Sequence, residues 1–398
     1  MRVVVTGVGV VSAIGSGAQF GHALERGTAG IGELTTFDPG DTLSVLAAEI
    51  PQFVIEEYLE SAKTYLDRAS GFLLAAGALA LRDAAFAVAS PAPGPEGFQG
   101  EPGLSFGTAY GCLETMGTFW GGVLEKGPRL ASSLLFTHSY ANTPVSLAAI
   151  EFRFTGPHHC FCSGAASAGY ALANAALQLQ MGRAPAVLAG GGEALSPYLY
   201  AAYAAAGALS PGAGGTEGLR PFAATRNGTV LGEGAGALLL ETEAAARARG
   251  AQPQALLLGH GCSALPGADG ARAAMAQALA AAGQEPGTVD AVFASASGLP
   301  EGDAWEATAL ESLFGGRRVP VVALKAAVGE TLGAGGALAA AAAVHALRTG
   351  TLPGVPGTEA PEFPLHLVGA PETAAVRQVL VNAFDAAAGC VSLLFGAA

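Results

Sequence analysis

The chain alternates between short apolar runs and longer segments with helical periodicity. Apolar runs of five to thirteen residues predict buried strands at 2–6, 103–107, 185–190 and 229–241. Apolar positions that recur every three to four residues predict helices at about 63–87, 111–125, 140–152 and 165–182. The first run, from Arg2 to Thr6, meets Gly7 and Gly9, so we expect this strand to end there in a tight turn.

After Ala251 the same alternation starts again. It predicts strands at 254–261, 291–295, 319–324, 376–384 and 389–395, and helices at 268–283, 302–314 and 331–348. Strands that alternate with helices indicate an α/β fold, and near-continuous apolar strands indicate sheets covered on both faces. Because the second half repeats the order of the first, we predict two similar βα halves, residues 1–250 and 251–398, packed together.

Composition and charge narrow the class of protein. Of the 398 residues, 51% are hydrophobic and only 13% are charged, which indicates a compact globular protein. The net charge of −13 and the lack of a basic run argue against nucleic-acid binding. The N-terminal MRVVVTGVGVV does not look like a cleavable leader, and the apolar run Thr331 to Leu347 is short for a membrane span. We therefore expect a cytoplasmic protein with no membrane partner.

Cysteine and histidine give no metal signature. The five cysteines are dispersed and form no pair of CxxC motifs, so no zinc site is predicted. Cys160 and Cys162 form a CxC pair, which is weak support for redox chemistry; buried thiols in a reducing compartment are the simpler interpretation. His138, His158 and His159 lack a carboxylate or third ligand at a convincing spacing, which favours structural or channel-lining roles.

The N-terminal TGVGVVSAIG invites a dinucleotide-binding interpretation, because glycine turns after a first strand can cradle a pyrophosphate. Gly7 and Gly9 fit that motif, but position 12 is serine. No acidic residue ends a second strand about 20 residues later, as ribose binding would require. A nicotinamide oxidoreductase is therefore only a remote alternative.

Four longer segments carry a more specific signal. They are AVLAGGGEALS (186–196), RPFAATRNGTVLGEGAGALLLE (220–241), ALKAAVGETLGAGGALAAAAAV (323–344) and NAFDAAAGCVSLLF (382–395). Together with Phe37-Asp38-Pro39 and LDRASGFLLAAGALAL (66–81), they make nearly the whole chain resemble the β-ketoacyl synthases of the thiolase superfamily. The resemblance implies a thiolase fold, a five-layered α-β-α-β-α core.

The resemblance also implies where the family's chemistry would lie. Such enzymes take an acyl chain from an acyl carrier protein onto a cysteine at a helix N-terminus, and two histidines support decarboxylation and condensation. Thiolate formation and oxyanion donors are what this chemistry needs. Counting from the flanking motifs, the nucleophile position is Ala165, and the two histidine positions are Ser295 and Glu330. Cys162 lies three residues before the nucleophile position.

The remaining positions extend this pattern. Lys325 and Phe384 match the family, whereas the closing turn that shapes its oxyanion hole reads DAAA at 385–388. A carboxylate at Glu330 is expected to repel a malonyl carboxylate. The chain is thus similar to the chain length factors, the ketosynthase-β subunits of type II polyketide synthases. The alternative is an active condensing enzyme, an acyltransferase with Cys162 as a relocated nucleophile.

A chain length factor implies particular partners and a particular role. It would pair with an active ketosynthase-α subunit as a heterodimer, wall the polyketide or polyene elongation channel and set the length of the product. No cofactor is expected, since the substrate arrives on the phosphopantetheine of an acyl carrier protein. That acidic carrier should dock mainly on the partner, because this chain carries a net charge of −13.

The resemblance places the channel wall on the segment CLETMGTFWGG. Leu113, Met116 and Trp120 match channel-facing positions, and their spacings of three and four put them on one helix face. The resemblance adds Phe136 and His138 from the next segment. The spacing of Leu113, Met116 and Trp120 alone would fit ordinary core residues. The resemblance to the chain length factors favours a place in the channel wall. Glu193 and Glu233 follow glycine-rich strand ends, and we expect them to hold turns.

Overall fold

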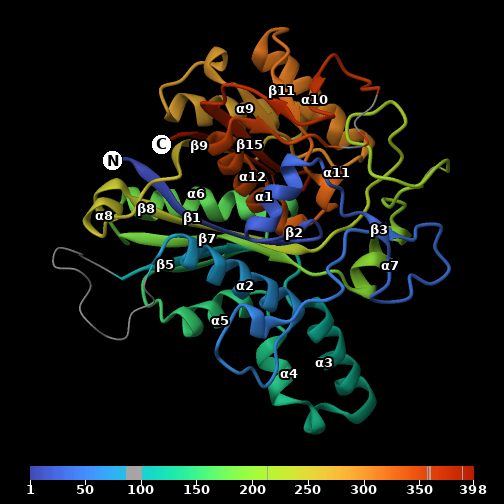
Figure 1. Ribbon diagram of the computed structural model, residues 1–398. Coiled ribbons are helices and arrows are strands. Elements are labelled where there is room, and N and C mark those ends of the chain that lie inside the picture. The colour runs from blue at the N-terminus through green and yellow to red at the C-terminus, as the bar shows by residue number, and fades with distance from the viewer. Residues whose placement is uncertain (87–100, 213, 356, 358–359, 388) are drawn as a thin grey trace.

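A computed structural model describes residues 1–86, 101–212, 214–355, 357, 360–387 and 389–398. It has five layers (Figure 1). Helices α2 (Arg68–Asp83) and α5 (Thr143–Phe152) cover one outer face, and α9 (Gly267–Ala281) and α10 (Pro300–Phe314) cover the other. Helices α6 (Ser167–Gln180) and α12 (Gly335–Thr349) lie between the two sheet layers. The predicted α-β-α-β-α arrangement is confirmed.

Within the described residues, the two sheet layers belong to one hydrogen-bonded sheet of 12 strands. Its order is β13-β11-β10-β15-β16-β9-β1-β8-β7-β5-β6, with β2 paired to β1. Strand β1 pairs with β8 along its length and with β9 only through Val3 to Val5, which is where one layer continues into the other. The bounds are β1 (Val3–Ser12), β2 (Gly15–Ser16), β5 (Gly103–Gly107), β6 (His158–Phe161), β7 (Ala186–Glu193), β8 (Gly234–Thr242), β9 (Ala255–Ser263), β10 (Ala291–Phe293), β11 (Pro320–Val322), β13 (His366–Leu367), β15 (Gln378–Asp385) and β16 (Gly389–Ala397).

The central helices are built from small residues because sheets press on them from both sides. Helix α12 reads GGALAAAAAVHALRT and is buried from Gly335 to Val344. Its alanines join a core cluster with apolar residues of β1, β8, β15 and β16. Alanine favours the helix and lets a sheet approach closely, which explains why this apolar run is a core helix. Among the described residues, no helix is both long and apolar enough to cross a bilayer.

The prediction for the first strand was wrong in its end point. Strand β1 does not stop at Gly7 but continues to Ser12, with a register shift between Val5 and Gly7. The glycines serve close packing instead of a turn. A Cβ added at Gly7 would lie 2.2 Å from the Ala80 carbonyl oxygen, and one at Gly9 would lie 2.0 Å from that of Ala76. Helix α2 therefore rests directly on the backbone of β1.

The other predicted elements are present with shifted ends. The helix predicted at 63–87 begins at Arg68, because the Asp67 carboxylate accepts the Ala69 N–H at 2.9 Å and caps it; residue 87 lies outside the described residues. Several short elements were not predicted, since they have too few residues to show a period. They include α1 (Ala18–Glu25), α4 (Ser133–His138), α7 (Pro197–Ala205), α8 (Glu243–Ala248), α11 (Lys325–Val328) and strand β6.

Candidate functional site

One cavity of ≈ 700 Å³ gathers the positions that the sequence singled out. Ala165 lies in a 3-10 turn, Gly164–Ala166, at the start of α6, and Ser295 follows β10. Lys325 begins α11, Glu330 follows it, and Phe384 lies near the end of β15. Strands from distant parts of the chain end at this cavity, so the turns after them converge there. Most of the remaining lining is apolar, with Leu265, Trp305 and Leu332 among it.

The predicted nucleophile position, Ala165, offers only a methyl group. Ala165 is 9% exposed, and its backbone N–H donates to Asp385 Oδ2 at 3.0 Å. Gly164 has a φ of +55°, and a Cβ there would lie 2.1 Å from the same oxygen. A glycine is therefore required for the Asp385 carboxylate to reach the start of the helix. Ala388, the last residue of the predicted DAAA turn, lies outside the described residues.

Ser295 is engaged with the neighbouring strand. Its hydroxyl accepts the Phe384 N–H at 2.9 Å, and its own backbone N–H donates to Glu306 Oε1 at 3.0 Å. The same Glu306 oxygen accepts Nδ2 of Asn382 at 2.8 Å. Ser295 thus ties the turn after β10 to β15, and its hydroxyl offers no imidazole at this predicted histidine position.

Lys325 and Glu330 form a buried ion pair. Lys325 Nζ lies 2.7 Å from Glu330 Oε2, and the two side chains are 8% and 5% exposed. The second carboxylate oxygen, Oε1, accepts the Leu332 N–H at 2.9 Å. The expected repulsion of a malonyl carboxylate by Glu330 needs correction, because the neighbouring ammonium compensates the negative charge.

Two further buried carboxyl groups, those of Asp303 and Glu306, line the cavity, and sequence reasoning gave them no chemical role. Burial raises the pKa of Glu306 to about 7 and that of Asp303 to about 6, because each loses hydration. Asp303 accepts the N–H groups of Phe222, Ser297 and Gly298, whereas Glu306 Oε2 has no partner. Two acids three residues apart at the start of a helix were the available signal, but exposed helices often begin the same way.

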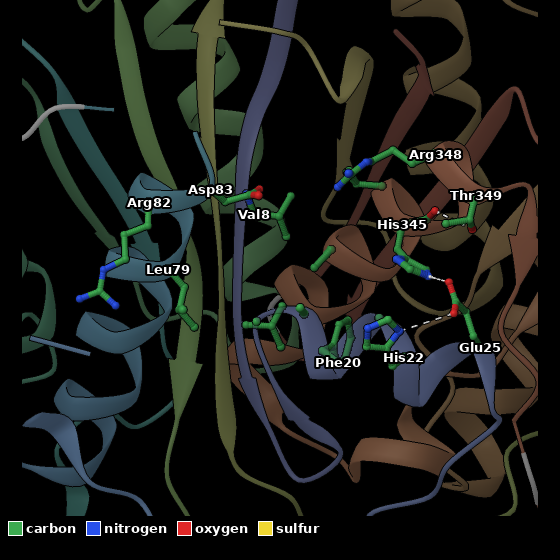
Figure 2. A pocket seen from close by; sticks show the side chains of 16 residues that line it. Val8, Phe20, His22, Glu25, Leu79, Arg82, Asp83, His345, Arg348 and Thr349 are labelled. Carbon is green, nitrogen blue, oxygen red and sulfur yellow. Dashed lines mark hydrogen bonds and ion pairs between the residues drawn. The ribbon is translucent and has the colours of Figure 1, made fainter. Parts of the chain in front are cut away.

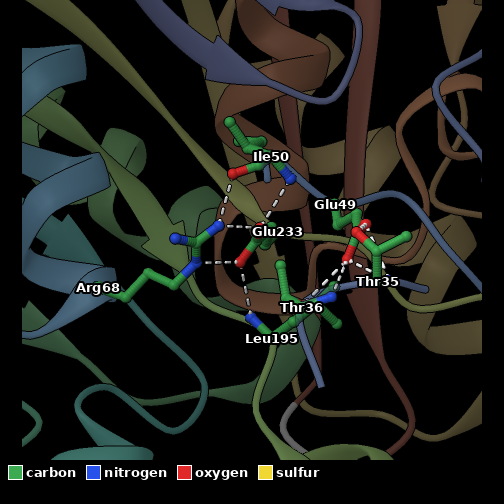
Figure 3. Close-up of polar contacts among 7 residues, drawn as sticks. All are labelled: Thr35, Thr36, Glu49, Ile50, Arg68, Leu195 and Glu233. Carbon is green, nitrogen blue, oxygen red and sulfur yellow. Dashed lines mark hydrogen bonds and ion pairs between the residues drawn. The ribbon is translucent and has the colours of Figure 1, made fainter. Parts of the chain in front are cut away.

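Glu193 and Glu233 hold turns, as predicted. Glu193 Oε2 accepts the N–H groups of Ala109 and Gly333, which joins β7 to the turn before α12. Burial raises the pKa of Glu193 to about 7. Glu233 accepts two hydrogen bonds from Arg68, and Figure 3 shows how the pair gathers the backbone of Ile50 and Leu195 around it. These contacts are structural.

The CxC pair lies beside the cavity lining and not in it. Cys160 is in strand β6 and Cys162 follows that strand, and neither is among the residues that line the ≈ 700 Å³ cavity. A hydrogen bond from Cys160 lowers the pKa of Cys162 to about 7, against the opposing effect of burial. Cys162 is exposed, so its thiol is accessible and partly ionised at neutral pH.

Three of the five predicted channel residues lie exposed on the protein surface, whereas Leu113 and His138 are half-buried. Leu113, the first residue of α3 (Leu113–Lys126), packs against the cluster of Leu195, Leu199 and Tyr200. Met116, Trp120 and Phe136 are 37%, 56% and 46% exposed. Phe119 of α3 links this helix to α4, because its ring contacts Phe136 of α4 as well as Trp120 of its own helix.

His138, at the end of α4, lies half-buried against Tyr65 with ring centroids 5.2 Å apart. Helices α3 and α4 together project from the body of the molecule (Figure 1). Further exposed apolar side chains lie on these helices and on the residues beside them. We call this the α3–α4 apolar surface; it comprises Met116, Trp120, Leu124, Leu130, Leu134, Phe136 and Tyr140.

A second cavity, of ≈ 670 Å³, lies between α1, α2 and α12 (Figure 2). There Glu25 faces two histidines: its carboxylate oxygens lie 3.2 Å from His345 Nε2 and 3.8 Å from His22 Nδ1. Burial lowers the pKa of His345. Across the described parts of the chain, no cluster of three or more His, Cys, Asp or Glu side chains could hold a metal ion.

The five layers and the cavity at the start of α6 define a thiolase-type α/β protein. A model of the β-ketoacyl synthase N-terminal domain matches residues 1–246, and one of the C-terminal domain matches residues 258–359. The chain therefore belongs to the β-ketoacyl synthase family. It is 31% identical, over 99% of its length and 97% of the relative's, to 3-oxoacyl-[acyl-carrier-protein] synthase 2 of Synechocystis sp..

Two further similarities point toward polyketide systems. The chain is 35% identical to a putative polyketide beta-ketoacyl synthase 2 of Streptomyces halstedii, covering 89% of this chain and 87% of the relative. Among solved structures, the ishigamide ketosynthase/chain length factor superposes with a TM-score of 0.91 at 28% identity, covering 100% of this chain and 99% of the other. The family thus includes relatives named for catalysis and neighbours named for chain-length control.

Proposed function

We propose that this protein is a non-catalytic chain length factor that pairs with an active ketosynthase. The observation that carries the proposal is the state of the nucleophile position: Ala165 has no nucleophilic atom, and its N–H is bound by the Asp385 carboxylate. Acyl transfer to a thiol requires both a nucleophile and free oxyanion donors. The Lys325–Glu330 ion pair also supports a non-catalytic role, because the ammonium and the carboxylate bind each other instead of a substrate.

Pairing with a second subunit is supported by two features of the surface. Strand β6 ends the strand path, so one of its edges is free for pairing within the described residues. The α3–α4 apolar surface gathers exposed aromatic and aliphatic side chains, which a partner would bury. In the proposed heterodimer the partner holds the catalytic thiol, receives the acyl carrier protein and builds the polyketide; no cofactor of this chain is required.

Chain length would be set by excluded volume. An elongation channel between the subunits would run past Met116 and Trp120, and a growing product that meets a bulky side chain must force strained packing. Each further buried CH₂ would otherwise stabilise the bound product by about 0.8 kcal/mol. The side chains that close the channel would therefore stop elongation.

The first test is intact-protein mass spectrometry of this chain and its co-expressed ketosynthase after exposure to an acyl-loaded carrier protein. We expect acyl mass only on the ketosynthase. Acyl mass on this chain would contradict the proposal, and peptide mapping would locate the modified residue.

The second candidate is a condensing enzyme that uses Cys162. It is favoured by one observation, the accessible thiol whose pKa is lowered to about 7. The variant C162A separates the two proposals. A chain length factor keeps full product formation in the heterodimer when Cys162 is replaced, whereas a relocated nucleophile loses both its acyl adduct and its product.

Channel control gives a prediction about product length. W120A and M116A should each lengthen the product of the reconstituted heterodimer by one or more elongation units, because each removes volume from the proposed wall. Product masses measure this directly. T118A is the matched control on the same helix, since Thr118 is exposed and its hydroxyl donates to the Glu114 carbonyl one turn earlier. Unchanged lengths in both variants would remove these residues from the channel.

A further inference from the structure

Asp385 occupies the anion-binding turn at the start of α6. We propose that its carboxylate is a built-in plug, which keeps this turn closed to a thioester oxygen or a substrate carboxylate whatever side chain stands at position 165. The inference rests on the proposed function and deepens it: it assigns inertness to a second residue besides Ala165.

The contact is specific in its geometry. Asp385 Oδ2 accepts the Ala165 N–H at 3.0 Å, while Oδ1 accepts the Ala387 N–H at 2.9 Å, so both oxygens are held. The carboxylate can approach only because position 164 is glycine, where a Cβ would lie 2.1 Å from Oδ2. A substrate oxygen seeking the Ala165 N–H would therefore meet an anion that already holds it.

The negative charge of Asp385 should also make any thiol placed at position 165 less reactive. A carboxylate beside a thiol disfavours the thiolate and raises the pKa of the thiol. The other charges that face the cavity include Glu301, Asp303, Glu306 and the Lys325–Glu330 pair. Among these, the single ammonium, that of Lys325, is already paired with Glu330.

The test restores a thiol with and without the plug. A165C, A165C/D385N and the control A165C/D38N are prepared as full chains together with the co-purified partner. Asp38 is exposed and accepts the Gly40 N–H in its own turn, so D38N removes an equal charge elsewhere. Each protein is treated with iodoacetamide or iodoacetate across pH 6–10, and the peptide that contains position 165 is quantified by mass spectrometry. The thiolate sulfur displaces iodide: a C–S bond forms, the C–I bond breaks, and the thiol proton passes to water.

We expect A165C and A165C/D38N to react alike, with the thiol titrating above the usual pKa of about 8.5. A165C/D385N should react at least about threefold faster at pH 7, with its pH profile shifted down by about one unit. The rate with anionic iodoacetate should rise more than that with neutral iodoacetamide. Identical profiles for A165C and A165C/D385N would overturn the proposal.

A folding failure would not hide the answer. A165C/D385S keeps a neutral acceptor for the Ala165 N–H and replaces D385N if the latter is insoluble; circular dichroism checks each fold. Failure of this test can be told apart from failure of the proposed function, because acylation of the natural chain is measured separately. A natural chain that takes up acyl mass at Cys162 would refute the chain length factor and leave the plug standing.

Discussion

Glu306 is a buried acid whose ionisation should couple folding to pH. Burial removes hydration from its carboxylate and raises its pKa from 4.5 to about 7, against the lowering effect of the hydrogen bonds from Asn382 and Ser295. The folded chain therefore holds a proton that the unfolded chain releases at lower pH. The stability that this group contributes is fully present below about pH 4.5 and is lost as the pH rises through 7.

E306Q should remove this dependence, because an amide cannot ionise. The difference in stability between E306Q and the natural chain should move in favour of E306Q by on the order of 3 kcal/mol between pH 4.5 and 8.5. Thermal unfolding of both proteins at several pH values measures it. E311Q, at an exposed position of the same helix, is the control and should show a constant difference. A constant difference for E306Q too would mean that Glu306 is ionised throughout.

The sequence predicted some residues of the candidate site but not the contacts between them. Ala165, Ser295 and Glu330 could be placed at one site because flanking glycine motifs fix their positions along the chain. The Asp385 contact could not be predicted, since it joins residues 220 positions apart and depends on the φ of Gly164. Nor could the Lys325–Glu330 ion pair, because a five-residue spacing across a turn does not dictate where two side chains point.

The strands and helices meet through glycines that cannot be read from hydrophobic periodicity. Gly7 and Gly9 were expected to end the first strand, because glycine most often interrupts regular structure. In fact they keep it continuous under α2. Periodicity predicted the existence and order of the long elements, whereas the ends depended on caps such as Asp67 and on such backbone contacts.

G9A should be severely destabilising, since its methyl group would overlap the Ala76 carbonyl oxygen in a core without free space. We expect a loss of about 3 kcal/mol or an insoluble protein. G121A is the matched control in helix α3, where an added Cβ has no heavy atom within 4 Å. It should raise stability by about 0.5–1 kcal/mol through helix propensity. Chemical denaturation compares the two, and a tolerated G9A would show that α2 can shift away from β1.

The whole molecule combines a large net negative charge with one projecting apolar surface. A monomer gains nothing from exposing Trp120 and Phe136 at 56% and 46%. In the proposed heterodimer, the net charge of −13 on this chain would leave the docking of an acidic carrier protein to the other subunit. Both properties fit a subunit that works within an assembly.

The double variant W120E/F136E should therefore abolish co-purification of the ketosynthase partner, because it places two charges in the apolar contact. Size-exclusion chromatography of the co-expressed pair measures this. L43E is the control: it makes the same kind of change at a leucine that is 82% exposed and lies outside the α3–α4 apolar surface. Retention of the complex by W120E/F136E would place the interface elsewhere.

The glycine contacts between strands and helices have an evolutionary consequence. At Gly9, Gly107 and Gly261 an added Cβ would overlap neighbouring backbone, so any larger residue there is excluded by the fold itself. The side chains around Ala165 face a cavity and are under no such constraint. The reactive groups of this site can therefore be replaced during evolution while the fold stays recognisable. A protein that loses one activity and gains another would then differ from its relatives mainly in the residues that line the cavity.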